Sequence, residues 1–570
     1  MDEAVATFSK VLESDSKCHE ALTWMAVLTK DPQNMSIALG YAERAVKLRP
    51  KDATGHGALG SGFLSANQPE KAIESLSLAI ELAPDIAEHR HNLALAHLLL
   101  QRNDEAIAQL RHAISIAPKS PQSYLTLAST YSLFGMAGQA IECLSEGLLQ
   151  LPKNAQLHSA IAGGFAMIGN DEAAEHHHRR ALELSPDSRS SFGTWLLNQG
   201  RFKEANTFFE AMIQEGTDPA FAYYSLMQSR KLTDSEADNA FVTEMVTLLR
   251  SGSLRPRSEM YLRYGLGRAE EQLKRFESAM EHFDAANLLA YTINRTGSPV
   301  TPARFAGEHK QARELYESLQ PLEANPLGPN ADSTDAPIFI IGMIRSGTTL
   351  LDQIVSSHPS VASGGELRFW IEESRRLVFQ KPTPTSEDLY ALAEEYSGYA
   401  RLLTGRGDRI TDKMPLNFAC AGIIASAMPK ARFLHIRRNP IDTCLSIWTT
   451  YFGQGAIFAY DKTNIVAYYR EYQKMMDYWR EKLPSDRLLE IDYEELISSP
   501  ASVVPMVIEF LGLPWDEACL HHDQNQSAIN TPSRWQARQP IYKTSIERWR
   551  NYEPWLGAFA ELLPVAQATL

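Results

Sequence analysis

Residues 337–351 read Pro-Ile-Phe-Ile-Ile-Gly-Met-Ile-Arg-Ser-Gly-Thr-Thr-Leu-Leu, and this stretch decides the fold of the second half of the chain. Its first five residues form a short apolar run rich in β-branched side chains, which is typical of a buried parallel strand. A loop with two glycines and three hydroxyl side chains follows, and then a helical pattern begins. Backbone N–H groups at the start of such a helix bind anions. The stretch therefore predicts a strand, a phosphate-binding loop and a helix.

Two similar apolar runs lie downstream of this stretch, at residues 431–436 and 487–491. Each predicts another buried strand, and helical patterns separate the three runs. Strands that alternate with helices are typical of an α/β domain with a parallel sheet. Upstream, residues 320–336 read QPLEANPLGPNADSTDA, and this mixture of Pro, Asn, Gly and Asp predicts an exposed linker.

Five prolines of the N-terminal part lie 34 residues apart, at Pro50, Pro84, Pro118, Pro152 and Pro186. Alanine or glycine recurs 24, 12 and 5 positions before each of them. Small residues at fixed positions let two helices pack closely, and a proline ends the second helix. The pattern resembles the tetratricopeptide repeat, a 34-residue helix–turn–helix unit that stacks into an α-superhelix.

The repeat pattern and the apolar runs together predict four regions. A tetratricopeptide-repeat array is expected over 1–216, and a further helical, repeat-like region over 217–319, where Gly267, Ala279 and Ala286 keep the repeat spacing. The linker 320–336 then leads to an α/β domain over 337–570. The predicted fold class is an N-terminal repeat superhelix followed by a P-loop-like α/β domain with a parallel sheet.

Charge and composition exclude several classes of protein. The net charge is −14, with 31 Lys+Arg and 42 Asp+Glu before residue 337, so a nucleic-acid partner is disfavoured. Apolar runs are too short for a membrane helix, which predicts no membrane insertion. The five cysteines form no C-x-x-C pair, which disfavours a disulfide framework or a zinc site. We expect free thiols and a cytoplasmic location.

The loop after the first strand differs from a nucleoside-triphosphate loop in one decisive position. Gly342, Gly347 and Thr349 have the spacing of G-x-x-x-x-G-K-[ST], but Thr348 occupies the lysine position. Arg345 instead places a cation inside the loop. A kinase or ATPase without that lysine is disfavoured.

The loop resembles the 5′-phosphosulfate loop of sulfotransferases, which take a sulfuryl group from 3′-phosphoadenosine 5′-phosphosulfate (PAPS). Its Arg-Ser-Gly-Thr-Thr form is similar to that of protein-tyrosine sulfotransferases and of bacterial sulfotransferases with tetratricopeptide repeats. The resemblance covers about residues 337–550 and implies PAPS as co-substrate, with no metal. It implies that the nucleotide is bound here by Arg345, Ser346, Gly347, Thr348 and Thr349.

Three later segments extend this resemblance. The stretch 437–446 resembles the family's 3′-phosphate segment, which implies that Arg438 and Ser446 hold that phosphate by a charge-assisted fork and a hydroxyl donor. Taken alone, Arg438 could also be a solvated surface arginine. Further nucleotide contacts are implied for Tyr493, which could equally be a core residue, for Ser533 in a closing loop, and for Arg548 in place of a lysine.

The resemblance also implies catalytic residues. Ser-Gly-Gly-Glu-Leu-Arg at 363–368 resembles the Gly-Glu-Glu-Thr-Arg segment of tyrosine sulfotransferases, which makes Glu366 the candidate general base, although Gly365 replaces the first glutamate. His358 is an alternative base, and a helix-end role for it is the other interpretation. Lys413, in a Lys-Met-Pro element, and Arg345 are the candidates for stabilising developing negative charge.

The leading interpretation is a PAPS-dependent sulfotransferase that acts on a protein tyrosine presented with help from the repeats. One alternative keeps the activity but replaces the acceptor with a carbohydrate, a lipid or a small metabolite. Another is a repeat adaptor whose nucleotide-binding domain is inactive. A protein or peptide partner on the repeats is expected, and a homodimer is compatible with the sequence.

Overall fold

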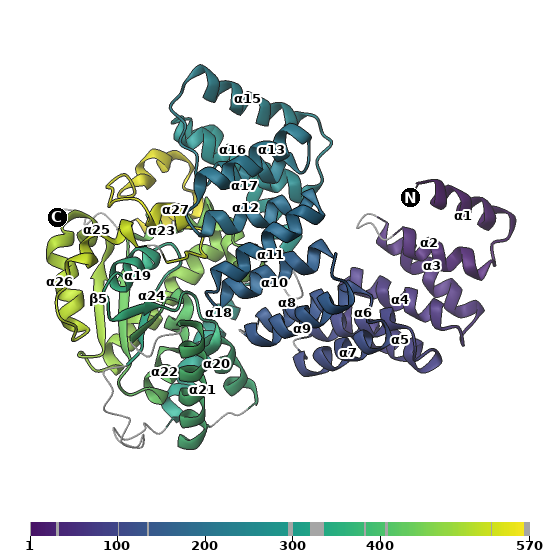
Figure 1. Cartoon of the computed structure of the whole chain (residues 1–570), viewed down its shortest axis with the longest axis horizontal. Coiled ribbons are helices and arrows are strands. Elements are labelled where there is room, and N and C mark those ends of the chain that lie inside the picture. Colours follow the sequence, from purple (N-terminus) through teal and green to yellow (C-terminus); the bar gives the residue numbers. More distant parts are fainter. Residues whose placement is uncertain are drawn as a thin grey trace. The chain divides into compact units, whose positions relative to one another are not determined.

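The computed structural model describes residues 2–29, 34–100, 102–133, 136–294, 300–319, 336–380, 384–404, 409–525 and 527–563 (Figure 1). Apart from short exchanges at their boundary, these residues form two compact units, one up to residue 185 and one from residue 186 onward. The predicted linker lies outside the described residues except for Ala336.

The first unit is built of antiparallel helix pairs. A single helix, α1 (Asp2–Ser14), precedes the pairs. The five pairs are α2 (His19–Leu28) with α3 (Met35–Leu48), α4 (Ala53–Ser65) with α5 (Pro69–Leu82), α6 (Ala87–Leu99) with α7 (Asn103–Ile116), α8 (Pro121–Leu133) with α9 (Ala137–Gln150), and α10 (Ala155–Met167) with α11 (Asp171–Leu184).

The small residues of the repeat lie where these helices cross. The alanines twelve positions before the prolines are all buried, at Ala38, Ala72, Ala106, Ala140 and Ala174. At Gly60 a Cβ atom would lie 2.5 Å from Cγ of Leu76, so no larger residue fits between α4 and α5. Each of the five prolines follows the second helix of its pair within two residues. The predicted tetratricopeptide array is confirmed.

The second unit begins with seven helices that precede the sheet. They are α12 (Arg189–Asn198), α13 (Phe202–Glu215), α14 (Pro219–Leu226), α15 (Glu236–Arg250), α16 (Pro256–Gln272), α17 (Phe276–Asn294) and α18 (Pro302–Ser318). Gly267 lies at the crossing of α16 and α17, where a Cβ would come 2.7 Å from the Phe283 ring. One small residue of the predicted spacing thus lies at a close helix crossing, and α12 and α13 belong to the same compact unit as the sheet.

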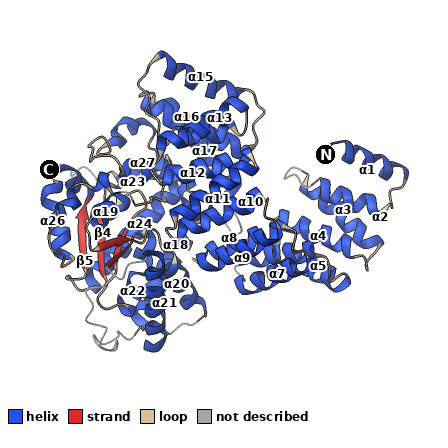
Figure 2. Cartoon of the chain, viewed as in Figure 1, coloured by secondary structure: helices blue, strands red, loops and turns tan. Residues whose placement is uncertain are grey.

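A five-stranded parallel sheet forms the centre of the second unit, in the order β2-β3-β1-β4-β5 (Figure 2). The strands are β1 (Ile338–Gly342), β2 (Val361–Ser363), β3 (Arg409–Asp412), β4 (Arg432–Arg437) and β5 (Leu488–Asp492). The three predicted strands are confirmed as β1, β4 and β5. The central strand β1 pairs with β3 on one side and β4 on the other, and ligands of such sheets bind at the carboxyl ends of the strands beside this point.

Helices cover both faces of the sheet. On one face, Ile338 and Ile340 of β1 pack in a cluster with α19 and α26; on the other, Phe339 and Ile341 pack in a cluster that includes α17 and α18. The helices after β1 are α19 (Thr348–Ser356), α20 (Phe369–Gln380), α21 (Ser386–Thr404), α22 (Ala421–Ala427), α23 (Pro440–Trp448), α24 (Lys462–Lys482), α25 (Tyr493–Ser498), α26 (Pro500–Phe510) and α27 (Arg534–Ala537). The core of the sheet thus extends into the repeat-like helices.

The cysteines agree with the sequence analysis. All five cysteines are free thiols, and four of them are buried, which confirms that prediction. Among the helices that the structure describes, none combines the length and the hydropathy needed to cross a bilayer.

Candidate functional site

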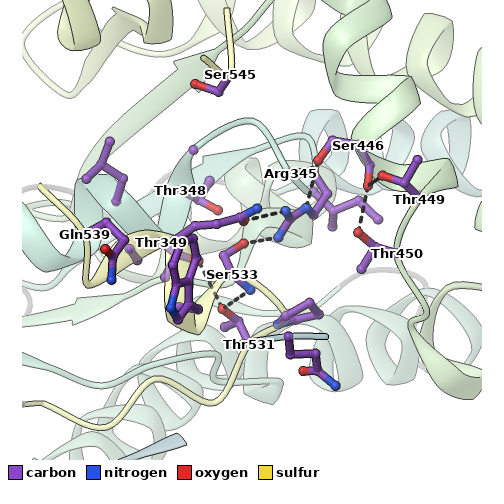
Figure 3. A pocket seen from close by; sticks show the side chains of 18 of the residues that line it. Arg345, Thr348, Thr349, Ser446, Thr449, Thr450, Thr531, Ser533, Gln539 and Ser545 are labelled. Carbon is purple, nitrogen blue, oxygen red and sulfur yellow. Dashed lines mark hydrogen bonds between the residues drawn. The ribbon is translucent and has the colours of Figure 1, made fainter. Parts of the chain in front are cut away.

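A cavity of about 870 Å³ lies at the carboxyl ends of β1, β4 and β5 in the second unit. Its walls come from the loop after β1, from α23, from residues 531–548, and from the turns and helices between residues 227 and 283. Figure 3 shows the part of this cavity around Arg345. Ligands of open parallel sheets usually bind at the carboxyl ends of the strands, next to the central strand from which the chain crosses to either side. The cavity lies at this position.

Two glycines shape the loop after β1. Gly342 has φ +153°, and a Cβ there would lie 2.6 Å from the carbonyl oxygen of Ile436 on β4. Gly347 has φ +108°, and a Cβ there would lie 2.5 Å from the Tyr493 ring. Glycine is required at both positions because a side chain would clash and the backbone would be strained. The loop can therefore turn tightly and begin α19 at Thr348 beside the cavity.

Arg345 lies at the tip of this loop and connects three walls of the cavity. Its φ is +69°, a left-handed conformation that is uncommon for a residue other than glycine. Its guanidinium donates to Ser446 Oγ of α23 at 3.1 Å, to Gln536 Oε1 of α27 at 2.8 Å and to Ser533 Oγ (Figure 3). The strained backbone of Arg345 places its guanidinium beside Ser446 and Gln536, which lie about 100 and 190 positions later in the sequence.

Arg438 and Tyr493 form a second contact group. The Arg438 guanidinium donates to the carbonyl oxygens of Arg345 at 3.2 Å and of Ser545 at 2.5 Å. It also lies 4.7 Å from the centre of the Tyr493 ring, a cation–π contact. The Tyr493 hydroxyl is 2.9 Å from Ser545 Oγ. These contacts bring the ends of β4 and β5 to the segment that closes the cavity.

Glu366 and Lys413 form an ion pair at the edge of the cavity. Lys413 Nζ is 2.5 Å from Glu366 Oε1, and a backbone bond of 2.8 Å from Lys413 N to the Gly365 carbonyl holds the two segments together. The Glu366 side chain is 39% exposed and lines the cavity, whereas the Lys413 side chain is only 2% exposed. A carboxylate therefore faces the cavity with a buried ammonium group directly behind it.

Two buried carboxyl groups, Asp352 and Asp412, also lie close enough to Lys413 for its charge to act on them. Burial nevertheless raises the pKa of both groups, that of Asp412 to about 8. The Asp412 carboxyl group accepts a hydrogen bond of 3.2 Å from the Tyr396 hydroxyl. Among the described residues, the ion pair of Lys413 is with Glu366.

The cavity is strongly cationic in a chain that is acidic overall. Seven cationic side chains line it against two carboxylates, Glu271 and Glu366; the cations are Arg230, Lys231, Arg268, Arg345, Arg368, Arg438 and Arg548. Burial, together with the guanidinium groups of Arg268 and Arg438, lowers the pKa of Arg345 to about 10, so it stays charged at pH 7. Such an excess of positive charge favours a polyanionic ligand.

Ten of the twelve predicted site residues line this cavity: Arg345, Gly347, Thr348, Thr349, Glu366, Arg438, Ser446, Tyr493, Ser533 and Arg548. The other two, Ser346 and Lys413, are buried behind its wall. The alternative base His358 lies outside the cavity. Its ring nitrogens contact the Pro514 carbonyl at 2.9 Å and the Ser360 N–H at 3.1 Å, a structural role at the end of α19.

Residues from α14 to α16 also line the cavity, and the sequence analysis did not predict them. They are Gln228, Arg230, Lys231, Arg268, Glu271 and Gln272. Glu271 accepts from Arg548 Nε at 2.6 Å and so holds one of the predicted nucleotide residues. No local motif marks these positions, because they look like ordinary polar residues of amphipathic helices.

The segment around α27 is held by α12 and by the residues that follow α14. Arg534 donates to the side chains of Asn198 and Gln228, and Arg538 donates to the Asn198 carbonyl at 2.9 Å. The Lys231 ammonium lies 5.1 Å from the centre of the Trp535 ring. The helices after residue 186 therefore hold the segment that carries Ser533 against the cavity.

Two buried donor atoms without partners bear on whether an anionic nucleotide would fit here. Ser346 Oγ and Arg438 Nε have no hydrogen-bond partner among the described residues. Both are donors beside a glycine loop that presents backbone N–H groups, and buried donors without partners are rare. An anion in the cavity would satisfy Arg438 Nε, because the Arg438 side chain lines the cavity, whereas Ser346 lies behind the wall. Within the described ranges, no group of three or more metal-ligating side chains is present.

Comparisons with known proteins assign families to both parts of the chain. Residues 337–517 match the sulfotransferase family, and residues 58–121 and 97–163 match tetratricopeptide repeats. An uncharacterized protein of Aquifex aeolicus (strain VF5) is 28% identical over 358 residues, covering 60% of this chain and 46% of that protein. A protein-tyrosine sulfotransferase of Drosophila melanogaster is 26% identical over 244 residues, covering 38% of this chain and 47% of that enzyme.

The chain spans about half the length of these curated relatives. Among solved structures, the crystal structure of MamA is 23% identical with a TM-score of 0.25, and it covers 27% of this chain and 89% of that one.

Proposed function

With a sulfotransferase-family domain at residues 337–517, we propose that this chain transfers the sulfuryl group of PAPS to an acceptor hydroxyl. One observation carries the proposal. Arg345 of the predicted phosphosulfate loop hydrogen-bonds Ser446 of the predicted 3′-phosphate segment and Ser533 of the predicted closing segment. Three motifs that resemble one family thus meet at a single guanidinium in a cationic cavity.

The nucleotide would be held by residues of four segments. The loop after β1 offers Arg345, backbone N–H groups and the hydroxyls of Thr348 and Thr349, while Arg438 and Ser446 offer a guanidinium and a hydroxyl. Guanidinium forks and oriented N–H groups are the donors that phosphate and sulfate esters require. Tyr493, Ser533 and Arg548 complete the proposed set.

Bound PAPS would supply the sulfuryl group. In the transfer, a bond forms between the acceptor oxygen and sulfur, and the bond from sulfur to the nucleotide's 5′-phosphate oxygen breaks. Glu366 would take the proton that the acceptor hydroxyl loses, since its carboxylate lines the cavity. Arg345 and the ammonium of Lys413 would stabilise the negative charge that develops on the oxygens.

A protein tyrosine is the proposed acceptor. Met414, Pro415 and Leu416 follow Lys413 and line the cavity, so an aromatic ring would meet apolar surface close to Glu366. The similarity to protein-tyrosine sulfotransferases supports the same acceptor. The tetratricopeptide repeats would bind the protein that carries the tyrosine. A homodimer and a cytoplasmic location stay predictions.

Replacing Arg438 tests the nucleotide site. We expect Arg438→Ala to weaken the binding of adenosine 3′,5′-bisphosphate about 10–150-fold, because a charge-assisted phosphate contact contributes roughly 1.5–3 kcal/mol. Binding of adenosine 5′-monophosphate should change little. Calorimetric titration of both nucleotides measures this difference. The matched control is Arg437→Ala, since Arg437 is exposed, pairs with Asp492 and does not line the cavity.

A wild-type protein that does not distinguish the two nucleotides would show that the 3′-phosphate site is misassigned. Equal losses in Arg438→Ala and Arg437→Ala would point to net charge rather than to a specific contact.

Removing the first unit tests acceptor recruitment. Deleting residues 1–185 should leave PAPS binding intact, because the cavity is built entirely from the second unit. Turnover of a protein acceptor should fall roughly 10-fold or more, since tethering raises its effective concentration. Comparing kcat/KM for a protein acceptor and for a short tyrosine peptide separates recruitment from catalysis. Undiminished turnover of the protein acceptor would reject the recruitment role.

A further inference from the structure

Arg268 is a cavity residue contributed by a helix outside the family match. It lies near the end of α16 and lines the same cavity as Arg345 and Ser446. Within the described part of the chain, its guanidinium has no hydrogen bond and no ion pair. Its positive charge instead influences Arg345 and Tyr542, which line the same cavity.

The acidic residues of α16 do not neutralise Arg268. Glu271, one turn later, holds Arg548, and Glu270 pairs with Arg275 at 3.4 Å. The other carboxylate of the cavity, Glu366, pairs with Lys413. Arg268 and Arg345 are therefore two guanidinium groups that line one cavity, and neither pairs with a carboxylate among the described residues. Such an arrangement repels unless an anion lies there.

Hydroxyl groups lie beside Arg345 in the same cavity. Figure 3 shows Ser446 of α23, with Thr449 and Thr450 just after that helix, on one side of Arg345. Ser446 Oγ accepts from Arg345 Nε at 3.1 Å, and Thr449 Oγ1 accepts from Arg548 at 3.3 Å. Guanidinium groups combined with hydroxyls are suited to a phosphate monoester, which has three oxygens to share among several donors.

We infer that Arg268 binds the 3′-phosphate of the nucleotide together with Arg438 and Ser446, which line the same cavity, so that a repeat-like helix completes the nucleotide site. This inference rests on the proposed function and adds a residue from outside residues 337–517 to it. It also gives α16 two roles in the site: Arg268 contacts the ligand, and Glu271 positions Arg548.

The test is a titration of adenosine 3′,5′-bisphosphate and adenosine 5′-monophosphate into the full chain carrying Arg268→Gln. Affinity for the bisphosphate should fall about 10–150-fold, as expected for a lost charge-assisted contact, and affinity for the monophosphate should stay within about twofold. Arg263→Gln on the same helix is the matched control. Arg263 pairs with Glu259 at 2.7 Å and does not line the cavity.

A thermal melt without nucleotide separates binding from folding. Since Arg268 has no pairing partner among the described residues and lies near other cations, Arg268→Gln should melt at the wild-type temperature or above it. Equal weakening of both nucleotides would overturn the 3′-phosphate assignment, and so would unchanged nucleotide binding combined with a raised KM for the acceptor. If the wild-type protein binds neither nucleotide, both the proposed function and this inference are rejected.

Discussion

Replacing Glu366 with glutamine is expected to lower kcat about 10²–10⁴-fold, the usual loss when a general base is removed. Glutamine keeps the length of the side chain, and its amide oxygen can still accept the hydrogen bond from Lys413 Nζ, but it cannot take a proton. PAPS affinity should hardly change, because the carboxylate is proposed to face the acceptor. Single-turnover rates at saturating PAPS measure the effect.

A second variant tests the alternative base. His358→Ala is the comparison, and we expect it to turn over normally because His358 lies outside the cavity. Normal turnover by Glu366→Gln with an inactive His358→Ala would move the base to His358. Loss of PAPS binding in Glu366→Gln would make Glu366 a structural residue.

Replacing Lys413 with methionine is expected to lower kcat about 10²–10³-fold, as when one preorganised donor to a developing charge is lost. Methionine fills a similar volume in this buried position but carries no charge. The variant also leaves Glu366 without its ion-pair partner. Rates at saturating PAPS and acceptor measure the loss, and a thermal melt reports the cost of breaking the pair.

The double variant Glu366→Gln with Lys413→Met separates a catalytic unit from a structural ion pair. Groups that act as one unit show strongly non-additive losses, so the double variant should be scarcely slower than the slower single variant. If Lys413→Met melts earlier but turns over at the wild-type rate, the lysine is structural and stabilisation of the transferred group must come from elsewhere.

Local patterns were enough to predict most of the fold. The repeat is predictable because close helix crossings need alanine or glycine at fixed positions, and those positions are buried as expected at Ala72 and Ala106. At least half of the residues in β1, β4 and β5 are apolar, which makes these strands visible in the sequence, although only β1 and β4 are largely buried.

The sequence analysis did not predict the strands β2 and β3, because contacts with residues distant in the sequence stabilise them. Residues 361–363 are too few for a period, and Arg-Ile-Thr-Asp at 409–412 is mostly polar although every residue is buried. Arg409 Nε donates to the Ala336 carbonyl at 3.2 Å, and Thr411 Oγ1 donates to Asp352 at 2.6 Å. Such contacts satisfy the polar groups but leave no local signal.

Some residues of the candidate site could likewise be predicted from local motifs, and others could not. Residues of the loop after β1 and of the β4 end lie in contiguous motifs, and the resemblance was sufficient to bring them forward as candidates. The wall from α14 to α16 depends on pairs such as Arg548 with Glu271, which are 277 positions apart. The sequence around a charged helix residue does not indicate such a distant partner. Arg268 and Glu271 could therefore be recognised as site residues only from the structure.

Transfer of labelled sulfate from PAPS tests the central claim most directly. The full wild-type chain and its Glu366→Gln variant are each incubated with ³⁵S-labelled PAPS and a cell extract, and the label is followed into protein and into small molecules. The account predicts that wild-type protein moves label into protein, in a bond stable to alkali as a tyrosine sulfate is, and that the variant moves little. Label in small molecules alone would keep the transferase and change the acceptor. Binding of PAPS by the wild-type protein with no transfer to either fraction would contradict the account and favour an adaptor with an inactive nucleotide-binding domain.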